Sequence, residues 1–122
     1  MLRQADIRDH WAKLRPLIER ALEGDDDHPE EVYAACRGNT AALYVAEDAA
    51  FVLRWTGRGD LRVWIAVGFG DHGVLDRHDE GLADIARNAG AESMSFLTRR
   101  KGFERALPAT WTSEATLYSR SV

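Results

Sequence analysis

The 122-residue sequence is poor in cysteine and lysine and has no long apolar run. Its single cysteine, Cys36, excludes an internal disulfide and a zinc site built from several cysteines. The longest uncharged apolar stretch, residues 63–70, is far too short to cross a bilayer. The first residues contain no apolar signal core. We therefore expect neither a membrane span nor export by a signal peptide.

Positive charge is also scarce. Lys and Arg together number 16 against 20 Asp and Glu, which gives a formal net charge of −4 at pH 7. This balance disfavours a protein that binds nucleic acid through bulk charge. The length fits one domain, residues 1–122, with a core of its own.

The apolar spacing predicts helices and strands in the order α, α, β, β, β, α, β, α, β. Apolar residues at helical spacing predict the two N-terminal helices, joined by an acidic linker at 24–28. From Ala41 the period changes to two and predicts an antiparallel meander whose third strand places Leu61, Val63, Ile65 and Val67 on one face. A helix over 76–89, a strand at 92–97, a short helix from 98 or 99 to 107 and a last strand at 111–120 follow.

This order resembles that of the GNAT (general N-acetyltransferase) fold. The most specific local match is segment 100–104, Arg-Lys-Gly-Phe-Glu, which is similar to the late family segment that ends in Gly-Phe. Segment 81–91, a helix ending in Gly-Ala before a strand, also matches. The resemblance implies an α/β (α+β) domain with a mixed, mostly antiparallel sheet of about five or six strands and helices on both faces.

More narrowly, the chain resembles small GNAT-like proteins encoded by tailed bacteriophages and prophages. The matching features are Trp11 and segments 16–22, 29–32, 42–46 and 100–103. This resemblance implies a phage or prophage origin.

Two parts of the family's acetyl-transfer apparatus are missing from the sequence. GNAT enzymes hold the pyrophosphate of acetyl-CoA with a Gln/Arg-x-x-Gly-x-Gly/Ala loop, and residues 67–81 contain no copy of it. The same stretch carries four acidic residues that would repel phosphate: Asp71, Asp76, Asp79 and Glu80. The family's general acid is often a Tyr four residues before the Gly of Gly-Phe, and Thr98 stands there.

We therefore expect a degenerate, non-catalytic GNAT-fold phage protein that acts through protein contacts or self-association, without cofactor or metal, in the virion or the host cytoplasm. Arg and Trp are enriched in interface hot spots. The candidate contact residues are Arg54, Trp55, Arg62, Trp64, Arg99, Arg100 and Lys101.

Two alternatives remain open. The first is an acetyl-CoA-dependent N-acetyltransferase with a divergent pyrophosphate loop, and the second is a small nucleic-acid-binding accessory domain, disfavoured by the net charge. If acetyl-CoA binds, the expected contact residues are Val67, Phe69, Gly70, Gly73 and Arg77.

Overall fold

The computed structural model describes residues 2–23, 26–57, 59–69, 74–97, 112–114 and 117–122. The elements are β1 (Arg3–Ala5), α1 (Ile7–Ala21), α2 (Pro29–Arg37), β2 (Ala41–Val45), β3 (Ala49–Trp55), β4 (Asp60–Gly68), α3 (Val74–Asn88), β5 (Ser93–Leu97), β6 (Thr112–Glu114) and β7 (Leu117–Ser121). The described strands form one sheet in the order β1-β2-β3-β4-β5-β7-β6. Only β4 and β5 pair in parallel, and the other neighbours are antiparallel.

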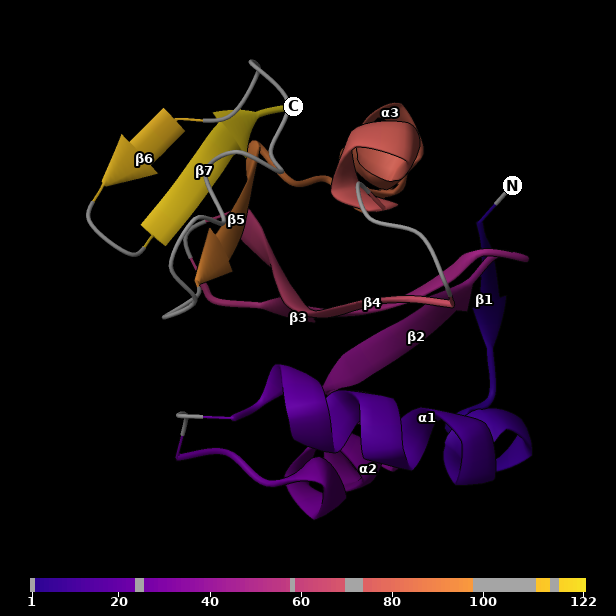
Figure 1. Ribbon diagram of the computed structural model, residues 1–122. Coiled ribbons are helices and arrows are strands. Elements are labelled where there is room, and N and C mark those ends of the chain that lie inside the picture. Colours follow the sequence, from indigo (N-terminus) through magenta and orange to yellow (C-terminus); the bar gives the residue numbers. More distant parts are fainter. Residues whose placement is uncertain (1, 24–25, 58, 70–73, 98–111, 115–116) are drawn as a thin grey trace.

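Helices cover both faces of the sheet (Figure 1). α1 and α2 lie on one face and α3 lies on the other. The expected α+β architecture with a mixed, mostly antiparallel sheet is therefore confirmed. The sequence analysis missed β1, and the single last strand expected over 111–120 contains the hairpin strands β6 and β7. The short helix expected after residue 97 lies outside the described residues.

The two N-terminal helices begin and end where local chemistry favours it. Asp6 caps α1, because its carboxylate accepts a hydrogen bond from the Arg8 backbone N–H at 2.9 Å. Pro16 lies inside α1, where we expected a kink or a new segment, yet the helix continues through it to Ala21. Pro29 begins α2, and Asn39 follows it with a φ of 63°.

The sheet separates two hydrophobic clusters. The cluster under α3 joins the sheet to that helix, and its members include Phe51, Leu82, Ala86 and Met94. The cluster under α1 and α2 joins the opposite face to these helices, and its members include Leu14, Ile18, Val32 and Leu43. Because each helix layer buries its own apolar stripe, the sheet is held rigidly between them.

Candidate functional site

The parallel strands β4 and β5 pair over only part of their length. Their register runs from Asp60 opposite Ser93 to Val63 opposite Phe96, whereas β4 continues to Gly68. Among the described residues, segment 64–68 therefore has no strand partner on the β5 side. The described residues give the backbone N–H and C=O groups of this edge no partner on the β5 side. Below, the word cleft denotes this edge of β4 beyond Val63, next to the end of β5.

A β-bulge marks the point where this cleft begins. On β3, Val52 pairs with Ile65 and its neighbour Leu53 pairs with Val63, so Trp64 is an extra residue on β4. A bulge of this kind bends the strand and increases its twist.

The bulge also changes which face each β4 side chain occupies. Leu61 and Val63 pack in the cluster under α3, but Ile65 and Val67 pack in the cluster under α1 and α2. The sequence-based assignment of these four residues to one face was wrong. Strict alternation assumes an uninterrupted ladder, and one inserted residue reverses it.

The N-terminal end of α3 lies at the mouth of this cleft. The helix follows β4 after residues 69–73 and begins at Val74. The first backbone N–H groups of a helix have no partner within the helix, and the dipole gives this end a partial positive charge. A helix start at the carboxyl ends of parallel strands is a common location for anionic groups of a ligand.

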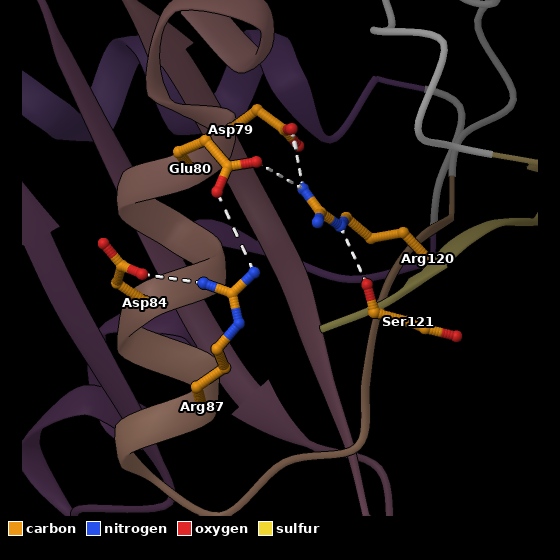
Figure 2. Close-up of polar contacts among 6 residues, drawn as sticks. All are labelled: Asp79, Glu80, Asp84, Arg87, Arg120 and Ser121. Carbon is orange, nitrogen blue, oxygen red and sulfur yellow. Dashed lines mark hydrogen bonds and ion pairs between the residues drawn. The ribbon is translucent and has the colours of Figure 1, made fainter.

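Two acidic residues of α3, Asp79 and Glu80, lie close to arginines. Asp79 is buried, and its carboxylate lies 2.7 Å from Arg120 Nη1 on β7, with both side chains 8% exposed (Figure 2). Glu80 lies 3.6 Å from the same Arg120 and 3.8 Å from Arg87. Arg120 thus offsets the charge of Asp79, and Glu80 has two arginines nearby. Asp71 and the side chain of Asp76 lie outside what the structure describes.

Basic side chains also lie close to the first turn of α3. Asp48 holds Arg77 and His78, with its two carboxylate oxygens 2.8 Å from Arg77 Nε and 2.8 Å from His78 Nε2. The hydrogen bonds from His78 and Arg77 hold the pKa of Asp48 below its usual range. The ammonium of Lys13 lies 4.0 Å from the centre of the Phe69 ring, just beyond β4.

The residues expected to contact acetyl-CoA fall in different environments. Val67 is buried under α1 and α2, and Phe69 is partly buried against the same cluster. Arg77 is exposed in the first turns of α3. Gly70 and Gly73 lie outside the described residues. Arg77 is thus exposed on α3, whereas the Val67 side chain packs on the face under α1 and α2, and contact of these residues with acetyl-CoA stays a prediction.

The candidate contact residues are only partly brought together. Arg54, Arg62 and Trp64 share the face under α1 and α2, and the Arg54 guanidinium lies 4.0 Å from the centre of the Trp64 ring. Trp55 is the next residue along β3, so it points to the opposite face, where it is 48% exposed. Arg99, Arg100 and Lys101 lie outside the described residues.

Sequence reasoning missed one side chain at the start of the cleft. Asp27, in the linker between α1 and α2, accepts a hydrogen bond from Trp64 Nε1 at 3.2 Å. The two residues are 37 positions apart, and the linker reads as an ordinary acidic turn. No signal in the sequence distinguishes Asp27 from Asp25 or Asp26.

The described residues hold neither a metal-binding cluster nor a membrane-spanning helix. They contain no group of three or more His, Cys, Asp or Glu side chains placed to hold a metal ion. They also contain no helix that is long and apolar enough to span a membrane.

Cys36 is expected to be unreactive at neutral pH. Burial raises the pKa of its thiol to about 11, and the thiolate is the reactive form. Iodoacetamide at pH 8 should label the folded protein much more slowly than the urea-unfolded protein, as followed by mass spectrometry. Equal labelling rates would contradict this.

The same pKa shift predicts a pH dependence of stability. Above about pH 9 the unfolded thiol loses its proton while the folded thiol keeps it, so the free energy of unfolding should fall as the pH rises further.

Comparison with known proteins identifies the fold. No protein-family model and no curated protein matches the sequence. An IAA acetyltransferase from Bacillus cereus ATCC 14579 matches the structure with a TM-score of 0.69 and 10% identity, covering 100% of this chain and 99% of that chain. A GNAT family acetyltransferase from Brucella melitensis in complex with acetyl-CoA matches with a TM-score of 0.62 and 16% identity, covering 99% of this chain and 86% of that chain. A GNAT family acetyltransferase from Elizabethkingia anophelis with acetyl-CoA bound matches with a TM-score of 0.58 and 12% identity, covering 100% of this chain and 97% of that chain.

The chain therefore has the fold of the GNAT acetyltransferases, as expected from its element order. At these identities the likeness establishes the fold, and activity has to be argued from the site. The expectation that no cofactor is involved is corrected by this finding. Two structures with this fold hold acetyl-CoA.

Proposed function

We propose that the protein is an acetyl-CoA-dependent N-acetyltransferase. The observation that carries this proposal is the cleft that opens between β4 and β5 at the Trp64 bulge, with the N-terminal end of α3 at its mouth. Solved structures of the same fold that hold acetyl-CoA support it. The arginines beside Asp79 and Glu80 reduce the electrostatic objection for two of the four carboxylates.

The residues at the cleft fit the chemical groups of acetyl-CoA. The unpaired backbone edge of segment 65–68 offers N–H and C=O groups to the amides of the pantetheine arm. The start of α3 offers backbone N–H groups to the pyrophosphate, and Arg77 carries a guanidinium in the first turns of this helix. When bound, acetyl-CoA supplies a thioester whose carbonyl carbon accepts an amine nitrogen.

Asp27 is the proposed acceptor for the proton of the incoming amine. An ammonium group must lose a proton before its nitrogen can attack a carbonyl. The Asp27 carboxylate is fixed by Trp64 at the start of the cleft, and its second oxygen makes no hydrogen bond with another described residue. By contrast, both oxygens of Asp48 are engaged by Arg77 and His78. Asp27 is therefore the better placed of these two carboxylates.

The activity is tested by the release of free coenzyme A. Purified protein is mixed with acetyl-CoA and a panel of primary amines, and the free thiol is measured with a chromogenic disulfide reagent. We expect amine-dependent release that exceeds background hydrolysis and an acetylated amine detected by mass spectrometry. Release without an acetylated product, or no release with any amine, would contradict the proposal.

A second candidate function, a protein-binding domain without catalysis, is favoured by the exposure of Trp55. Large exposed aromatic residues are enriched in interface hot spots. If Trp55 mediates self-association, the sedimentation coefficient of the wild type should rise with concentration and that of Trp55→Ser should not.

None of the three similar structures named above is described as a phage protein, so phage origin and a place in the virion stay predictions from the sequence.

A further inference from the structure

Two arginines face each other where β4 meets the start of the cleft. Arg54 on β3 and Arg62 on β4 are directly opposite in the antiparallel register, so their side chains share the face under α1 and α2. Like charges in directly opposite positions destabilise a sheet. Both side chains are also half-buried, which increases the electrostatic cost.

Neither guanidinium is neutralised by a carboxylate of the described residues. Arg54 lies over the Trp64 ring, and Arg62 Nε donates a hydrogen bond to the Ser95 hydroxyl at 3.2 Å. Both contacts fix the position of the guanidinium, but neither supplies a negative charge. Paired arginines held in this way have donors left for a planar anion such as a carboxylate.

Two carboxylates occupy the same face, and each is engaged by neutral donors. Asp60 accepts hydrogen bonds from the hydroxyls of Ser93, Ser95 and Thr56. Asp27 accepts from the Trp64 indole. Arginines and carboxylates that lie side by side without pairing form a surface that is complementary to a molecule with both charges.

We propose that the acceptor is a small molecule that carries both an amine and a carboxylate. Its carboxylate binds to Arg54 and Arg62, and its amine lies near Asp27 at the start of the cleft. The Arg54 guanidinium lies 4.0 Å from the centre of the Trp64 ring, and the Asp27 carboxylate lies 3.2 Å from Nε1 of the same indole. This spacing suits an acceptor whose two charged groups are separated by only a few bonds. The inference rests on the proposed function.

The test compares amines in matched pairs that differ only in the carboxylate. Glycine, β-alanine and γ-aminobutyrate are assayed beside glycinamide, β-alaninamide and γ-aminobutyramide, with coenzyme A release as the readout. We expect kcat/KM to be at least about tenfold higher for the carboxylate member of the best pair, because a charge-assisted contact to two arginines is lost in the amide. The double variant Arg54→Gln, Arg62→Gln should lose this preference through a higher KM.

Matched variants separate recognition from folding. The variant Arg54→Lys, Arg62→Lys keeps both charges and should retain part of the preference, and Arg15→Gln, a change on exposed α1, should behave as the wild type. The increase in melting temperature caused by acetyl-CoA should be the same in all of them. If the Gln variant does not fold, the comparison of carboxylates with carboxamides in the wild type still tests whether the protein recognises the carboxylate of its acceptor.

Three results would overturn the inference. They are equal kcat/KM for both members of every pair, an unchanged preference in the folded Gln variant, and no turnover of any carboxylate member by a protein that binds acetyl-CoA and acetylates other amines. A wild type that neither binds acetyl-CoA nor releases coenzyme A would overturn the proposed function itself, and this inference with it.

Discussion

Replacing Asp79 by alanine is expected to destabilise the protein by about 3–5 kcal/mol. The change leaves Arg120 buried, with Glu80 as its remaining acidic neighbour among the described residues, 3.6 Å away on an exposed side chain. The Asp79–Arg120 pair connects α3 to β7, so its loss also loosens the contact between that helix and this strand. Urea unfolding followed by circular dichroism measures the difference in free energy of unfolding.

Two further variants make this prediction specific to the buried ion pair. Asp84→Ala removes an exposed partner of Arg87 on the same helix and should cost less than about 1 kcal/mol. The double variant Asp79→Leu, Arg120→Met removes both charges and should recover most of the lost stability. A cost for Asp79→Ala as small as that for Asp84→Ala would show that the pair is not buried in solution.

Replacing Asp27 by asparagine is expected to reduce kcat by about 10²–10⁴-fold. Asparagine keeps an oxygen that can accept the Trp64 N–H bond, so the linker should keep its position, but a neutral amide cannot take a proton from an ammonium group. Steady-state assays of coenzyme A release across pH 6–10 measure the effect. The rate of the variant should recover partly at high pH, where more of the amine is already deprotonated.

Asp26→Asn is the matched control for this change. Asp26 is the exposed neighbour of Asp27 in the same linker, and its replacement should leave kcat unchanged. Both variants should gain the same thermal stability from acetyl-CoA as the wild type. A normal kcat for Asp27→Asn would exclude Asp27 as the proton acceptor, but it would not contradict the proposed acetyl-CoA site.

The order of helices and strands could be predicted because it depends on local patterns. Apolar spacing, the Asp6 cap and the Pro29 helix start all act within a few residues of one another. β1 was missed because a strand of three residues gives no periodic signal, and it exists only by pairing with β2. The fold class therefore followed from the sequence, whereas the edge of the sheet did not.

The cleft itself could not be predicted, because its parts depend on tertiary contacts. The alternation of apolar and other residues in β4 continues without a break through Trp64, so no local sequence pattern predicts the bulge. Asp79 and Arg120 are 41 positions apart, and a count of acidic residues in α3 cannot reveal that they pair. The expectation against a cofactor treated each carboxylate as an unpaired charge, and the Asp79–Arg120 pair could not be seen from the sequence.

The most direct test of the account is a titration of ¹⁵N-labelled protein with acetyl-CoA, followed by amide chemical shifts. We predict saturable shifts concentrated in two regions, β4 residues 65–68 and the first turns of α3 at 74–78, with far smaller changes in α2 and β1. These regions line the cleft that begins at the Trp64 bulge. No saturable shift at millimolar acetyl-CoA, or shifts centred elsewhere on the protein, would contradict the proposal that this cleft holds the acyl donor.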